Sequence, residues 1–249
     1  MLTIIPVKGI PDIESGDNLG EIIVGRLKDQ EEDFQEGDVT VVSQKVVSKA
    51  EGRVVSLSKV TPSTFASFVA KESGKDPRQV EVILRETRNI VRMRAGHLIT
   101  ETKHGFICAN AGVDASNVGK GKDTVALLPL NPDASADRIG KTIRKLTGKT
   151  VAVIITDTFG RAWRMGQVNF AIGVSGMKPI RDYRGTRDMY RHTLHVTEIA
   201  VADELASAAE LVMNKADKIP AALIRGYKVR RGKGTSKELL RPEEMDFFR

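Results

Sequence analysis

An apolar, β-branched run from Val151 to Thr156 stops abruptly at two polar residues, Asp157 and Thr158. Such a run predicts a strand that is buried on both faces, as in the centre of a sheet covered by helices. Open α/β sheets bind ligands outside the carboxyl ends of their strands. We therefore expect Asp157 and Thr158 to lie at a ligand site, and we expect the chain to turn through Gly160.

Hydrophobic patterns elsewhere predict further strands and helices. Strands are expected at residues 2–7, 39–42, 125–128, 169–174, 194–201 and 221–226, with a meander of short strands between 89 and 112. Helices are expected after the capping residue Asn18, from Thr61 and Pro62 to Gly74, after Asp76, over residues 133–148, and after the capping residue Asp203. These patterns predict a strand-rich α/β chain with mixed α/β sheets.

The amino-acid composition indicates a globular protein and excludes several other classes. The 249 residues are 41% hydrophobic, which is typical of a globular chain. No run of about 18 apolar residues occurs, and the apolar start of the chain is broken by Pro6, too early for a signal peptide. We therefore expect a cytoplasmic protein that contacts no membrane. The single cysteine, Cys108, excludes an internal disulfide and a cysteine-cluster metal site, and its apolar neighbours predict that it is buried.

The net charge of +7 and the isoelectric point near 9.5 indicate an anionic partner. A nucleic-acid-binding protein is one candidate, although aromatic residues make up only 5% of the chain and no helix-turn-helix, zinc-finger or RNA-recognition pattern is present. Small polyanionic substrates explain the same charge equally well.

Polar loops and strand ends supply candidate binding groups. The stretch from Lys8 to Asp17 reads equally as a ligand loop or as a plain connection. Residues 43–53 collect hydroxyls, an amide and three cations that suit phosphate oxygens, while an exposed strand or hairpin is the better-supported interpretation from the residues alone. The arginines between 181 and 191 favour an anionic ligand and internal pairing about equally. We expect the basic, then acidic C-terminal stretch after Arg225 to form an arm on a partner subunit.

The sequence NAGVDASN, residues 110–117, gathers oxygen donors in a short loop. Oxygen ligands are what Mg²⁺ and Mn²⁺ prefer, but Asn and Asp are also common turn residues. The following GKGK lacks the spacing of a Walker phosphate loop, so a Walker-type nucleotide site is excluded.

Six stretches together carry a resemblance to a known family. In chain order they are PVKGIPDI, VVSQKVVSKAEGR, NAGVDASN, VIITDTFGR, NFAIGVSG, and VADELASAAELVM with IPAALIRG. From Ile5 to Gly226 the chain resembles the coenzyme F420:L-glutamate ligase (F420-0:γ-glutamyl ligase) family. The resemblance implies a two-subdomain α+β fold specific to this family, neither P-loop nor ATP-grasp, and an intertwined homodimer. It implies a single ligase domain over residues 1–249, with a subdomain boundary that the sequence does not locate, and without the C-terminal flavin-reductase domain of some relatives.

The resemblance also implies an activity, GTP-dependent addition of L-glutamate to coenzyme F420-0 with release of GDP and phosphate. Mg²⁺ or Mn²⁺, as one or two ions, is the implied cofactor, with K⁺ as a further candidate. By motif matching, Asp114 and Asp157 are the implied metal ligands with Thr158, and Asp114, Asp157 and Lys49 the implied catalytic residues. The implied contacts to GTP are Ile10, Pro11, Asp12, Ile13, Ser43, Gln44, Lys49 and Asn117.

One residue departs from the family pattern. Relatives often carry Gln or Glu where this chain has Lys215, and a protonated lysine cannot ligate Mg²⁺. Lys215 is therefore expected to contact a phosphate of the nucleotide, or Asp217 to take over as a ligand. The same departure keeps open a non-catalytic GTP-binding homologue beside the ligase, and a nucleic-acid-binding protein remains the alternative from another class.

Overall fold

A mixed five-stranded sheet forms the centre of the molecule. The computed structural model describes residues 1–116, 118 and 123–247. The strand order is β1 (Thr3–Pro6), β12 (Ala221–Arg225), β2 (Val39–Ser43), β8 (Ala152–Arg161) and β9 (Arg164–Ser175). Strands β2 and β8 are parallel, and the other neighbours are antiparallel. The predicted mixed α+β class is therefore confirmed.

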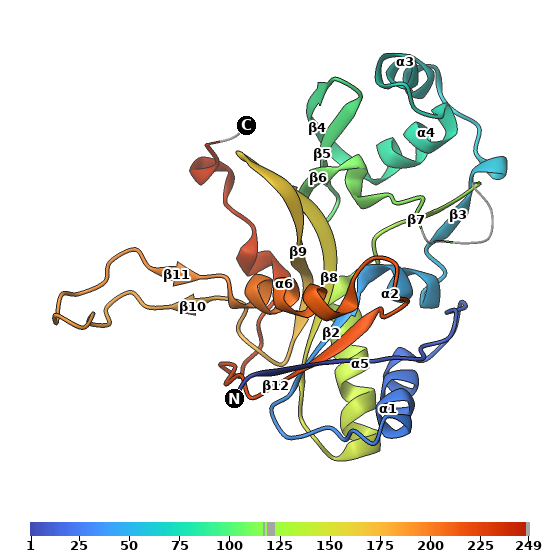
Figure 1. Cartoon of the computed structure of the whole chain (residues 1–249). Helices are drawn as coiled ribbons and strands as arrows, with labels where there is room; N and C mark the ends of the chain where they lie inside the picture. The colour runs from blue at the N-terminus through green and yellow to red at the C-terminus, as the bar shows by residue number, and fades with distance from the viewer. Residues whose placement is uncertain (117, 119–122, 248–249) are drawn as a thin grey trace.

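Helices cover both faces of this sheet (Figure 1). Helices α1 (Leu19–Asp29) and α5 (Pro132–Thr147) pack on one face, and α6 (Val201–Met213) packs on the other. Because side chains alternate along a strand, Val153 and Ile155 enter the first core while Ile154 enters the second. This confirms that β8 is buried on both faces, as its apolar run predicts. The first core also holds Val47 of α2 (Gln44–Ala50).

A third hydrophobic core lies away from the central sheet. Its side chains come from the strands β3 (Val54–Ser56), β5 (His97–Thr102) and β7 (Thr124–Ala126) and from the helices α3 (Thr64–Ser73) and α4 (Pro77–Glu86). Strand β5 lies between β4 (Thr87–Arg94) and β6 (Ile107–Ala109) in an antiparallel meander. Ile83, Leu98 and Val125 are fully buried in it. The meander confirms the prediction for residues 89–112. The division into two subdomains and the dimer stay predictions.

Several predicted boundaries are wrong for identifiable reasons. Residues after Ser43 form helix α2 rather than an exposed strand or hairpin, because Val47 is drawn into the core beside β2. Strand β8 does not turn at Gly160, which pairs with Gln167 of β9. Helix α3 begins at Thr64, after the cap Ser63, rather than at Thr61 and Pro62.

An extended arm leaves the body between β9 and α6 (Figure 1). Its two short strands, β10 (Arg181–Asp182) and β11 (Glu198–Ile199), pair antiparallel. The predicted strand over 194–201 is therefore wrong except at Glu198–Ile199. Helix α6 begins at Val201, and Asp203 lies inside its first turn, where its carboxylate accepts a hydrogen bond from the Ala171 N–H of β9 at 2.8 Å. Asp203 thus links helix and sheet instead of capping.

The C-terminal segment packs against its own chain. The Ser236 N–H and hydroxyl both donate to the Asp133 carboxylate at the start of α5. Tyr227, Val229 and Leu239 pack on the core beneath α6. These residues hold the segment on its own chain, whereas Met245 and Phe247 are exposed, and the expected contact with a partner subunit stays a prediction. No helix in the described part of the chain is long and apolar enough to cross a membrane.

Candidate functional site

A cavity of about 1160 Å³ opens where β2 ends, beside the stretch of β8 from Thr156 to Gly160. Ser43 ends β2 directly beside Thr156, so the strand register brings Asp157 and Thr158 into the cavity wall next to the start of α2. The loop after β6 supplies the opposite wall, including Asp114, which pairs through its backbone with Ala126 of β7. Segments far apart in the sequence therefore meet where the apolar pattern of β8 predicted a ligand site.

Asp114 and Asp157 face this cavity in different electrostatic states. Burial raises the pKa of Asp157 to about 6; the Thr158 N–H opposes this shift and the charge of Asp114 adds to it. Burial also acts to raise the pKa of Asp114, but hydrogen bonds from Lys45 and the Ser116 N–H, with the Lys45 charge, hold it below its usual value. The two carboxylates are therefore close enough to interact, and an added cation would stabilise the charged form of Asp157.

Two lysines of α2 line the same cavity one helical turn apart. Lys45 Nζ lies 2.9 Å from an Asp114 carboxylate oxygen and 2.9 Å from Ser116 Oγ. Lys49 Nζ lies 2.7 Å from Asp12 Oδ1, which ties the loop after β1 to the helix. The cavity therefore presents ammonium donors beside carboxylates, a combination that suits a phosphorylated ligand with its metal ion.

Most of the residues predicted for the site line this one cavity. They are Ile10, Pro11, Asp12, Ser43, Lys49, Asp114, Asp157, Thr158 and Lys215. Two others point elsewhere: the Ile13 side chain is buried in the core, and the fully buried Gln44 accepts a hydrogen bond from Ser48 Oγ. Asn117 lies outside the described residues. The structure thus brings the residues together, and their roles stay predictions.

Sequence reasoning did not assign several other residues of the cavity wall. In the sequence Lys45 is one of three cations within residues 43–53, and nothing local distinguishes it from the other two. Only the fold places its ammonium against the Asp114 carboxylate. Asn110 and Ala111 adopt left-handed backbone conformations, φ 55° and 53°, that are costly for residues other than glycine. The buried Asn110 Oδ1 has no hydrogen-bond partner among the described residues. Asn169 and Glu210 reach the cavity from β9 and α6; both stand in stretches that carry the family resemblance, but the sequence assigned neither of them a role.

The donor set fits one hard divalent ion. No group of three or more His, Cys, Asp and Glu side chains that could hold a metal occurs in the part of the chain that the structure describes. Mg²⁺ in nucleotide sites is commonly bound through one or two carboxylates, with phosphate oxygens and water completing its shell. Asp114 and Asp157 could supply those carboxylates. A cation would stabilise the desolvated Asp157 and the Asn110 Oδ1, which has no hydrogen-bond partner among the described residues.

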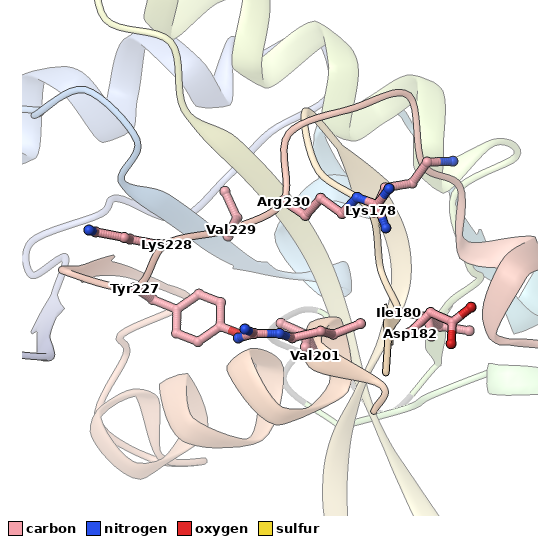
Figure 2. Close-up of a pocket in the computed structure, with 9 residues that line it drawn as sticks. Lys178, Ile180, Asp182, Val201, Tyr227, Lys228, Val229 and Arg230 are labelled. Atoms are coloured by element: carbon pink, nitrogen blue, oxygen red, sulfur yellow. The ribbon is translucent and has the colours of Figure 1, made fainter. Parts of the chain in front are cut away.

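A second, smaller cavity of about 250 Å³ lies at the root of the arm (Figure 2). Its wall is basic, with Lys178, Arg181, Lys228 and Arg230 around a single carboxylate, Asp182. None of the residues predicted to bind nucleotide or metal lies here, so the candidate site is the larger cavity.

Ion pairs within the arm explain part of its arginine cluster. Arg184 pairs with Asp182 at 2.8 Å and with Glu198 at 3.0 Å, and the Arg181 guanidinium lies over the Tyr183 ring. No described residue of the arm lines the larger cavity. The structure thus supports internal pairing for Arg184, and a ligand role for the other arginines of the cluster stays a prediction.

Comparisons with known proteins identify the family of this chain. The family model described as F420-0:Gamma-glutamyl ligase matches residues 9–226. A protein named coenzyme F420:L-glutamate ligase from Methanothermobacter thermautotrophicus is 47% identical over 251 residues, covering 100% of this chain and 99% of the relative. Proteins of the same name from Methanocaldococcus jannaschii and Methanopyrus kandleri are 46% and 45% identical, over 96% and 100% of this chain and 94% and 98% of their own lengths. The chain therefore belongs to the F420-0:Gamma-glutamyl ligase family and is a ligase.

Proposed function

We propose that this chain joins L-glutamate to coenzyme F420-0 through an amide bond and uses GTP as the energy source. The observation that carries the proposal is the convergence of Asp114 and Asp157 with Lys45 and Lys49 on one cavity of about 1160 Å³. The names of the relatives supply the glutamate and the F420 substrate. The choice of GTP comes from the family resemblance, and the cationic wall of the cavity supports a triphosphate ligand.

The chemistry requires activation of a carboxylate, because a carboxylate is a poor electrophile. In the proposed reaction a carboxylate oxygen of F420-0 takes the γ-phosphoryl group of GTP, and GDP leaves. The amine of glutamate then attacks the acyl carbon and gives up a proton, and phosphate departs with the electrons of the broken acyl–oxygen bond. The products are the amide, GDP and phosphate.

The side chains of the cavity support the proposed phosphoryl-transfer step. Lys45 and Lys49 each present an ammonium group that can donate to phosphate oxygens and hold the triphosphate in line with the acceptor. Asp114 and Asp157 would hold Mg²⁺ or Mn²⁺, which neutralises charge on the phosphates when bound. Asp12 fixes the position of Lys49 and so links the N-terminal loop to the phosphate-binding wall.

The proposed working unit is a cytoplasmic homodimer with the two-subdomain fold of the family. The separate third core supports two subdomains. The arm exposes Met189, Tyr190 and Val196, each more than 70% accessible, and such apolar side chains gain free energy when a second chain covers them. Light scattering after gel filtration should give the mass of a dimer, and a monomer at all concentrations would contradict this part of the proposal.

A direct assay tests the reaction. The protein is incubated with F420-0, L-glutamate, Mn²⁺ or Mg²⁺, and either GTP or ATP, and the products are separated by mass spectrometry. We expect products heavier by glutamyl increments, together with phosphate release, in the GTP samples. Nucleotide binding without either product would favour the non-catalytic homologue. Salt-sensitive binding to RNA or DNA without nucleotide turnover would favour the nucleic-acid-binding alternative.

A further inference from the structure

Three oxygen atoms from three different elements surround the Lys215 ammonium in the cavity. Lys215 Nζ lies 2.5 Å from Thr158 Oγ1 of β8 and 3.3 Å from Asn169 Oδ1 of β9. Glu210 Oε1 of α6 lies 3.6 Å from the same nitrogen. Thr158 also donates to Asn169 Oδ1 at 2.7 Å, so the neutral oxygens are held together independently of the lysine.

A hydroxyl, an amide oxygen and a carboxylate form the kind of oxygen set that binds hard divalent ions in proteins. Here that set holds the chain's own cation. An ammonium is a compact positive charge with three donors and no acceptor, so it meets the same oxygens by hydrogen bonding that a metal ion would meet by coordination. Lys215 and a metal ion cannot share this position.

The loop after α6 fixes the lysine in this position. Asn214 ends the helix with a positive φ of 51° and turns the chain so that Lys215 faces the cavity. The Asn214 amide donates to Asp217 Oδ2 at 2.8 Å. Asp217 is thereby engaged with the loop itself and does not line the cavity, so it does not replace Lys215 among the three oxygens.

We propose that Lys215 Nζ acts as a tethered cation in place of a second divalent ion, so that the nucleotide-bound protein takes up one divalent ion per chain, at Asp114 and Asp157. The inference rests on the proposed function, because it assumes that a nucleotide and a metal ion enter this cavity. The Lys215 ammonium contacts Thr158, which directly follows Asp157 in the chain. It therefore lies next to a carboxylate that is proposed to bind the divalent ion. Lys215 therefore supplies a single, permanent charge where a second ion would supply an exchangeable double charge.

The number of bound ions tests the proposal without an activity measurement. The protein is equilibrated with Mn²⁺ and a non-hydrolysable GTP analogue, and bound Mn²⁺ is counted by electron paramagnetic resonance against bound nucleotide. We expect one Mn²⁺ per chain in the wild-type protein. In Lys215→Gln the amide oxygen joins the three oxygens and the charge is gone, so the count should rise to two. Lys218→Gln removes a neighbouring lysine of the same cavity wall and should leave the count at one.

Other counts of bound Mn²⁺ would overturn either the role of Lys215 or the proposed function. Two ions in the wild-type protein, or one ion in a folded Lys215→Gln variant, would overturn the inference and leave the proposed ligase function standing. The wild-type count decides the question if the variant does not fold. Binding of neither the analogue nor Mn²⁺ by the wild-type protein would instead overturn the proposed function, and the inference with it.

Discussion

Replacing Asp157 by Asn should make the protein without its ligands more stable while destroying its activity. Burial raises the pKa of this carboxyl from 3.8 to about 6, so at pH 7 the folded chain holds an ionised group in an unfavourable place. A shift of this size corresponds to up to about 3 kcal/mol. Asn has nearly the same shape and no charge, so the variant should recover most of this free energy at neutral pH.

The sign of this effect depends on pH. Between about pH 3.8 and 6 the folded protein keeps the proton that the unfolded chain releases, so the penalty grows as pH rises through this window and is fully present above about pH 6. Below pH 3.8 both states are protonated and the penalty is absent. The advantage of Asp157→Asn should therefore be largest at pH 7.5 and about 1 kcal/mol at pH 4.5.

Urea unfolding of both proteins at the two pH values, in the presence of a chelator, measures this difference. Asp182→Asn is the matched control, because hydrogen bonds from Arg184 lower the pKa of that exposed carboxyl to about 2 and its removal should bring no gain in stability. Added Mn²⁺ with nucleotide should stabilise the wild-type protein and not Asp157→Asn. An Asn variant that is no more stable than wild type at pH 7.5 would refute the electrostatic argument for this site.

Two further outcomes follow from named contacts. Lys45→Gln removes the ion pair with Asp114, so the pKa of Asp114 should rise toward its ordinary range. The affinity for GTP should fall by about 10- to 100-fold, which is the effect of losing one charge-assisted hydrogen bond. Calorimetric titration measures this affinity, and an unchanged value would remove Lys45 from the phosphate site. Burial raises the pKa of Cys108 to about 12, so the thiol should resist a disulfide reagent at pH 8 until urea unfolds the chain, and rapid labelling of the native protein would contradict its buried position.

Local patterns predicted the elements that depend on burial and capping. The apolar run of β8 identified a strand covered on both faces, and the caps at Asn18 and Gly148 have the predicted roles at the ends of their helices. These features are readable because hydrophobic alternation and capping hydrogen bonds act over a few residues. The motifs around Asp114 and Asp157 likewise pointed to residues that line one cavity.

Tertiary packing decided what the patterns left open or misassigned. Whether residues 44–50 form a strand or a helix depended on the core beside β2. As a helix, this segment directs the Val47 side chain into that core. Asp203 was a plausible cap by sequence, yet its carboxylate reaches across to β9. Both depend on neighbours that are distant in the chain, and no local propensity encodes them.

The candidate site shows the same division. Sequence alone determined the α+β class, the polar residues that follow the apolar run of β8 and the family resemblance, and it identified Lys215 as a departure. Only the folded chain showed that Lys45 pairs with Asp114, and that Lys215 lies among Thr158, Asn169 and Glu210. The physical reason is that the electrostatics of a buried group depends on which charges and dipoles the fold brings within a few ångströms, and those partners come from strands and helices separated by tens of residues.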